Sequence, residues 1–216
     1  MITILYIHGM GGGEDSRIPG ILTSLLPEMR IVIRTYDFDP QLASEQIASW
    51  VDEVKPSVVI GESMGAVHAI AIKGVPHILV SPSLNAAVYF HHLAPLTRIP
   101  GVTGLLDRKF HPKKGRRQAL HFTYDRLRKW DKYRERAYAN STASGGTDYF
   151  HAFFGTKDHF RRSGVVMVST WRKWFGDGSY DIYDGSHFME EQYIRTMLIP
   201  EIRKVSSAFS GSGAEN

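Results

Sequence analysis

The sequence predicts an α/β fold with three layers, in which helices cover both faces of a mainly parallel six-stranded sheet. Short runs rich in Ile, Val and aromatic residues alternate along the chain with stretches of helical periodicity. The runs contain few polar residues, as expected of strands that are buried on both faces. Six runs have this character: 2–7, 31–36, 57–61, 77–81, 148–154 and 179–183.

Helical periodicity fills most of the connections between these runs. The Asp39-Pro40 pair is a favourable helix start, because Pro at the first helical position needs no hydrogen-bond partner for its nitrogen. Pro200 should bend the last helix. We therefore expect helices over 40–54, 64–73, 165–175 and 188–205.

The alternation fails once, between residues 82 and 147, where no run reads as a strand. This span is far longer than an ordinary connection. Its second half, 118–139, carries apolar residues at three- and four-residue spacing, namely Leu120, Tyr124, Leu127, Trp130, Tyr133 and Ala137. We interpret 82–147 as a helical cap inserted above the carboxyl ends of the strands.

The length of 216 residues suits one domain with a full-sized core, and we expect that domain to span 1–208. We expect 209–216 to be a disordered tail or the remnant of a tag, because the stretch SGSGAEN that ends it is small and polar. The absence of cysteine excludes disulfides, thiolate metal sites and a cysteine nucleophile. No apolar run approaches the roughly 20 residues of a membrane span, and 2–7 is too short for a signal peptide, so we expect a cytoplasmic protein.

The net charge of +4 hides an asymmetry along the chain. Residues 108–136 contain 12 Lys and Arg against three Asp and Glu. The simplest interpretation is a solvated amphipathic helix packed on the domain. A second interpretation is attraction of an anionic substrate or a membrane surface, and nucleic acid is the least favoured partner.

The stretch VVIGESMGA, residues 58–66, holds Ser63 between two glycines. The pattern G-x-S-x-G alone is weak evidence, since a glycine-rich turn without chemistry can carry it. Here an apolar strand ends at Gly61 and a helix-compatible run follows at once. So tight a turn forces the serine backbone into a strained conformation and exposes its hydroxyl. We therefore expect Ser63 to be a nucleophile.

A nucleophilic serine needs a base and an acid that orients the base. His187 follows the last expected strand and Asp158 follows the one before it, so both should lie at the same sheet edge as Ser63. The chain order Ser, Asp, His is that of one hydrolase fold and of neither common protease order. The rivals are Asp177 and Asp184, both in turns, and His159, which neighbours Asp158.

The developing oxyanion would be held by backbone N–H groups, for which we expect those of Met10 and Met64. Met64 follows the nucleophile, and Met10 lies in the glycine-rich loop HGMGGG at 8–13. We expect His8 to hold this loop, together with Gly9, by hydrogen bonding. The loop could instead bind phosphate, but it lacks the G-x-G-x-x-G spacing and the G-K-[ST] ending of phosphate-binding motifs.

Together, LYIHGMGG, VVIGESMGA, GTKDHF and DGSHF resemble the α/β-hydrolase superfamily, most nearly its short, single-domain, bacterial esterase-like members. The resemblance implies the strand order second, first, third, fourth, fifth, sixth. It also implies that Ser63, Asp158 and His187 form a triad with oxyanion donors at Met10 and Met64, and that no cofactor or metal takes part. The basic cap has no counterpart in this resemblance.

The sequence therefore favours a serine hydrolase of small carboxylic esters that forms an acyl-enzyme intermediate. Thioesters and small amides remain open as substrates, as does an anionic acyl compound. The alternative is a non-catalytic binding protein that keeps this fold and uses its basic cap to hold an anionic partner. The oligomeric state is not predicted.

Overall fold

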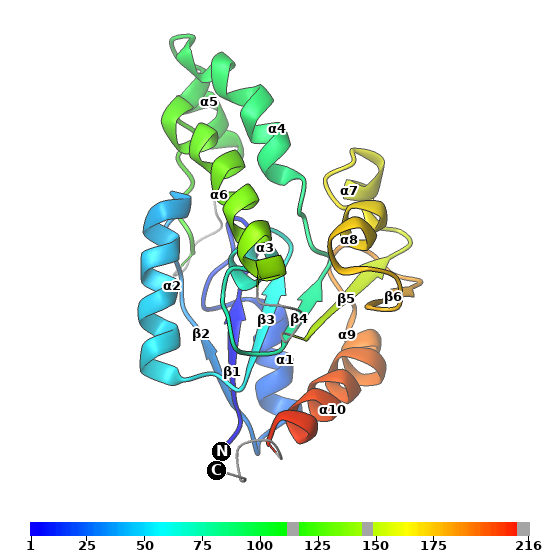
Figure 1. Cartoon of the computed structure of the whole chain (residues 1–216). Coiled ribbons are helices and arrows are strands. Elements are labelled where there is room, and N and C mark those ends of the chain that lie inside the picture. The colour runs from blue at the N-terminus through cyan, green and yellow to red at the C-terminus, as the bar shows by residue number, and fades with distance from the viewer. Residues whose placement is uncertain (112–116, 144–148, 211–216) are drawn as a thin grey trace.

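A computed structural model describes residues 1–111, 117–143 and 149–210 of the chain. Its centre is one six-stranded sheet in the order β2-β1-β3-β4-β5-β6, with every neighbouring pair parallel (Figure 1). The strands are β1 (Thr3–Ile7), β2 (Arg30–Ile33), β3 (Val58–Glu62), β4 (His77–Val80), β5 (Phe150–Gly155) and β6 (Tyr180–Tyr183). The fold class and the strand order are those that the sequence predicted.

Alternate side chains of the strands enter two separate cores, one on each face of the sheet. Leu5 and Ile7 of β1 join one core, whereas Ile4 and Tyr6 join the other. The first core is closed by α2 (Pro40–Val54), α3 (Gly65–Ala69) and α8 (Val168–Phe175). The second is closed by α1 (Arg17–Leu25), α9 (Glu191–Tyr193) and α10 (Ile199–Ser210). Double coverage explains why the inner strands β1 and β4 are buried at every position, whereas the edge strands β2 and β6 are partly exposed.

The expected helices form, with some corrected boundaries. Helix α2 has the predicted range, and the Asp39 carboxylate accepts a hydrogen bond from the Gln41 N–H at its start. Helix α3 is shorter than 64–73, because the chain after Ala69 tightens into turns and reverses at Gly74 with φ +75°. The expected helix 188–205 begins later and is interrupted by a π-helical turn, η2 (Ile194–Leu198), just before Pro200. Since proline has no N–H, a widened turn is a usual way to accommodate it.

The cap is helical, as predicted, and lies beyond the carboxyl ends of the strands (Figure 1). It contains α4 (Ala86–Leu93), the 3₁₀ helix η1 (Ala94–Arg98), α5 (Val102–Lys109) and α6 (Tyr124–Ala143). The amphipathic helix expected from 118 begins only at Tyr124, and Gln118 instead hydrogen-bonds to the β1–α1 loop. The described residues do not include 112–116 and 144–147 of the predicted cap or 211–216 of the predicted tail. Ser210, which the prediction placed in the tail, belongs to α10.

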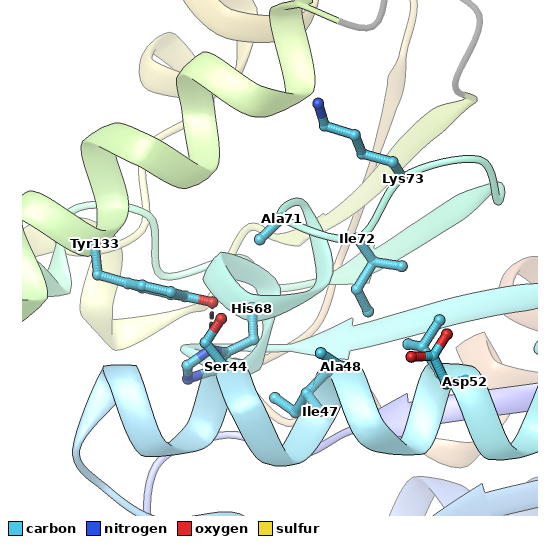
Figure 2. Close-up of a pocket in the computed structure, with 10 residues that line it drawn as sticks. Ser44, Ile47, Ala48, Asp52, His68, Ala71, Ile72, Lys73 and Tyr133 are labelled. Carbon is cyan, nitrogen blue, oxygen red and sulfur yellow. Dashed lines mark hydrogen bonds between the residues drawn. The ribbon is translucent and has the colours of Figure 1, made fainter.

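Helix α6 attaches the cap to the domain through its apolar face. Leu127, Trp130, Tyr133 and Ala137, all on that face, are buried. The Tyr133 hydroxyl lies 2.9 Å from His68 Nδ1 on α3, beside a cavity of about 210 Å³ between α2, α3 and α6 (Figure 2). Lys129 Nζ lies 2.6 Å from the Asp39 carboxylate.

Within the described ranges, no helix is both long and apolar enough to cross a membrane.

Candidate active site

Ser63 lies in the tight turn between β3 and α3 with φ 52°, a left-handed conformation that is unusual for serine. The flanking glycines make this turn possible. A Cβ atom at Gly65 would lie 2.2 Å from the Ile7 carbonyl oxygen, and one at Gly61 would lie 2.7 Å from the Ala69 Cβ. Both glycines therefore allow α3 to pack directly against the strands, which holds the strained serine in place.

The structure brings Ser63, His187 and Asp158 into one hydrogen-bonded line. His187 Nε2 lies 2.9 Å from Ser63 Oγ, and His187 Nδ1 lies 2.7 Å from Asp158 Oδ2. Asp158 and His187 are each 2% exposed. The other Asp158 oxygen accepts a hydrogen bond of 2.8 Å from the Phe160 N–H, at the start of α7 (His159–Arg162). This bond fixes the carboxylate that faces the imidazole.

Aromatic rings hold the His187 imidazole from two sides. The Phe160 and Phe188 rings meet it edge to face, with centroids 4.7 and 5.3 Å from that of the imidazole. Such packing restricts rotation of the ring, so the imidazole stays aligned with its two hydrogen-bond partners.

The residues that rivalled the predicted base and acid contact other partners. Asp184 accepts hydrogen bonds from the Thr156 hydroxyl and from Lys157, and these bonds lower the pKa of its carboxyl. Asp177 pairs with Arg172. His159 is exposed, and the centroid of its ring lies 5.9 Å from that of His187. None of these side chains has a recorded hydrogen bond with Ser63 or His187.

The loop between β1 and α1 approaches Ser63 closely. A Cβ atom at Gly9 would lie 3.0 Å from that of Ser63, so only glycine fits there without displacement. The Gly12 N–H donates to the Gly9 carbonyl, and His8 Nδ1 lies 2.7 Å from the same oxygen. Burial lowers the pKa of His8 to about 4, so the ring is neutral at neutral pH and Nδ1 carries the proton that it shares with Gly9.

Met10 and Met64 are the two residues whose N–H groups were expected to bind the oxyanion. Met64 directly follows Ser63, and Met10 lines the same cavity as Ser63 and His187. Among the described residues, neither N–H donates a recorded hydrogen bond. Both are therefore available to an oxygen atom bound in front of Ser63.

Two residues at this site were not foreseen from the sequence. Ser83, 2% exposed and just after β4, places its hydroxyl 3.0 Å from Ser63 Oγ, and its N–H donates to the Ser63 carbonyl. The position of Ser83 just after the fourth predicted strand could have indicated its role, because that position lies at the same sheet edge as Ser63. The second residue, Gln118, carries no signal of its own in the sequence.

Gln118 connects the cap to the glycine-rich loop. Its side-chain oxygen accepts the Gly11 N–H at 3.0 Å, its own N–H donates to the Gly12 carbonyl, and its side-chain nitrogen donates to the Asp37 carbonyl. The neighbouring Arg117 forms an isolated antiparallel bridge with Gly13. These contacts hold Arg117 and Gln118 against the loop, so the predicted helix does not begin at 118.

A cavity of about 530 Å³ opens in front of Ser63. The charged side chains of Asp15, Arg17, Glu62 and Arg117 line it, and Arg117 pairs with Asp15 at 2.9 Å. Glu62 accepts a hydrogen bond from the Tyr6 hydroxyl, and burial raises the pKa of its carboxyl. Within the part of the chain that the structure describes, no three His, Cys, Asp or Glu side chains are grouped so that they could hold a metal ion.

Comparison with known proteins gives structural neighbours only. No protein-family model matches the sequence, and no curated protein does. One similar structure is Est1E from Butyrivibrio proteoclasticus with ferulic acid bound, at a TM-score of 0.62, 15% identity, and coverage of 96% of this chain and 90% of that one.

Two further neighbours are α/β-hydrolase domain-containing protein 10 from mouse and a methylesterase from Arabidopsis. The mouse protein has a TM-score of 0.58 and 14% identity, with coverage of 95% of this chain and 90% of that one. The plant protein has a TM-score of 0.53 and 13% identity, with coverage of 94% of this chain and 99% of that one. Since these similarities extend over nearly the whole chain and agree with its sheet order, the protein has the α/β-hydrolase fold.

Proposed function

We propose that the protein is a serine hydrolase that cleaves carboxylic esters, with Ser63 as nucleophile, His187 as general base and acid, and Asp158 as the carboxylate that orients His187. The observation that carries the proposal is the continuous line of hydrogen bonds from Asp158 through His187 to a serine in a strained turn. A serine in a turn without chemistry needs neither a buried histidine nor a buried carboxylate beyond it.

In the first half of the reaction, Ser63 Oγ attacks the ester carbonyl carbon and its proton passes to His187 Nε2. Asp158 accepts the Nδ1–H of the same ring and stabilises the imidazolium that forms. The carbonyl oxygen becomes an oxyanion, to which the N–H groups of Met10 and Met64 donate. When the tetrahedral intermediate collapses, the C–O bond to the alcohol breaks and His187 returns the proton to the leaving oxygen.

In the second half, water replaces the alcohol. His187 takes a proton from water, the hydroxide oxygen attacks the acyl carbon, and the second tetrahedral intermediate releases the carboxylic acid and restores Ser63. Because Ser63 directs its own proton to His187, the Ser83 hydroxyl is left to donate to Ser63 Oγ at the 3.0 Å contact. This donor helps to keep the nucleophile facing the imidazole.

A small organic ester suits the site. The cavity volume of about 530 Å³ is within the ordinary range for small-molecule pockets. Two structural neighbours support this class, since one was solved with ferulic acid bound and another is a methylesterase. Thioesters and small amides need the same attack and the same oxyanion donors, so both belong among the substrates to be tested. No cofactor has a part in this reaction.

The decisive experiment combines fluorophosphonate labelling with hydrolysis of p-nitrophenyl butyrate. We expect the wild-type protein to be labelled and active, and Ser63→Ala to be unlabelled, with kcat lower by on the order of a millionfold. A Ser57→Ala variant, altered in a serine at the opposite end of β3, serves as the matched control. A folded wild-type protein that is neither labelled nor active would favour the non-catalytic binding protein instead.

A further inference from the structure

The end of the cap exposes an unusual number of large apolar side chains. Leu96, Ile99, Leu105 and Phe110 are 50, 53, 55 and 39% exposed. They belong to η1, to α5 and to the residues directly after each. Together with three exposed cations from the same segments they form what we call the cap tip: Leu96, Arg98, Ile99, Leu105, Arg108, Lys109 and Phe110.

Helix α5 is the anomalous element in this surface. It buries none of its eight residues, although three of them are Val or Leu. Leu105, Arg108 and Lys109 share one face, because residues three and four positions apart lie together on a helix. Helix α5 lies at the end of the molecule opposite the N-terminus, so its outer face is directed away from the sheet (Figure 1). Apolar residues gathered on a free surface indicate a binding partner.

The charge of the cap tip limits what that partner can be. Arg98, Arg108 and Lys109 are exposed, and none of them has a recorded ion pair among the described residues. The nearby carboxylate of Asp107 accepts hydrogen bonds from the His121 ring and from the Phe122 N–H. The tip is therefore apolar and positive at once. A second copy of the chain would bring like charges together, which disfavours self-association through this surface.

We propose that the cap tip docks the protein on anionic lipid bilayers, with the apolar side chains entering the interface and the cations contacting lipid headgroups. Such interfaces bind surfaces on which Leu, Ile and Phe are mixed with Lys and Arg, because burial of apolar area and attraction to the negative surface act together. The proposal stands apart from the catalytic one, since it uses no residue near Ser63. A bilayer is also a source of hydrophobic esters.

The test is sedimentation of the full-length protein with vesicles of phosphatidylcholine alone or of phosphatidylcholine mixed with phosphatidylserine, whose headgroups make the surface negative. We expect binding to the anionic vesicles, weak binding to the neutral ones, and loss of binding as salt is raised. Ile99→Ser/Leu105→Ser and Arg108→Glu/Lys109→Glu should each lower the vesicle-binding constant by roughly tenfold or more.

Two matched controls separate docking from general surface effects. Leu42→Ser/Ile182→Ser removes equally exposed apolar residues outside the cap, and Lys73→Glu/Lys173→Glu reverses two exposed charges outside it. Both control pairs should bind vesicles as the wild type does. All four variants should keep the wild-type circular dichroism spectrum, which reports folding whether or not the protein is a hydrolase.

Other results would overturn the proposal. These are absence of binding to anionic vesicles, equal binding to neutral and anionic vesicles, or equal losses in the tip variants and the controls. A dimer in analytical ultracentrifugation that Ile99→Ser/Leu105→Ser abolishes would assign the tip to a second copy of the chain instead.

Discussion

The turn around Ser63 is tightly packed, whereas the cap tip is exposed to solvent. At the turn, Gly9, Gly61 and Gly65 bring backbones into direct contact, so that nearly every atom has a neighbour on all sides. At the tip, α5 has no fully buried residue and Gly104 has open space around it. The contrast shows that substitutions at the turn meet packed backbone, whereas substitutions at the tip meet solvent.

The largest expected effect tests the fixed geometry of the triad. Asp158→Asn should lower kcat by about 10⁴-fold, because an amide cannot accept the Nδ1–H in the same way and the ring loses its productive tautomer. Asp184→Asn, in the neighbouring loop, should leave kcat unchanged, since its partners are Thr156 and Lys157. Steady-state hydrolysis of p-nitrophenyl butyrate measures both. The reverse result would move the acid to Asp184.

The second prediction compares one glycine from each region. Gly65→Ala should destabilise the protein by about 3 kcal/mol, because the added Cβ collides with backbone that cannot move aside. Gly104→Ala should stabilise it by about 0.5–1 kcal/mol, as alanine does on an unobstructed helix surface. Urea denaturation gives both free energies of unfolding. Similar changes in the free energy of unfolding at the two positions would contradict this difference in packing.

The third prediction concerns the contact between the two regions. Gln118→Ala removes the acceptor of the Gly11 N–H, so the loop that carries Met10 should lose its alignment. We expect kcat to fall by roughly tenfold, less than the loss of an oxyanion donor itself, with little change in KM. Gln118→Glu keeps an acceptor oxygen and should recover part of the rate. A Gln118→Ala variant with altered KM alone would mean that the residue serves substrate binding.

The smallest expected effect is a pH dependence of stability at the attachment of the cap. Burial lowers the pKa of His68 to about 3 from its ordinary value of 6.5, so the unfolded chain binds more protons than the folded one between these values. The free energy of unfolding should therefore fall as pH decreases from about 6.5 toward 3.

Because His8 is also buried and neutral, the comparison needs a variant. His68→Gln should show a shallower fall of the free energy of unfolding between pH 7 and pH 5 than the wild type, since one of the two titrating rings is gone. Denaturation in urea at the two pH values measures the difference. An unchanged slope would mean that His68 does not contribute.

Much of the fold followed from local pattern. The six apolar runs, the Asp39-Pro40 helix start and the apolar face of α6 each depend on residues close together in the chain, and the structure has all of them. Predictions were less accurate where distant contacts decide the conformation. Residues 118–123 carry helical periodicity but are not helical, and the hydrogen bonds of Gln118 go to the loop at 9–13 instead.

By itself, the sequence indicated which serine, histidine and aspartate follow strands of the sheet, because parallel strands bring their carboxyl ends to one edge. The strand order came from the resemblance to the α/β-hydrolases. Only the tertiary structure decided that the Ser83 hydroxyl touches Ser63, that Gln118 hydrogen-bonds to the glycine-rich loop and that the apolar side chains of the cap tip are exposed. Ser83 is 20 residues from Ser63 and Gln118 is 107 residues from Gly11, and contacts between such segments leave no periodic signal in the chain.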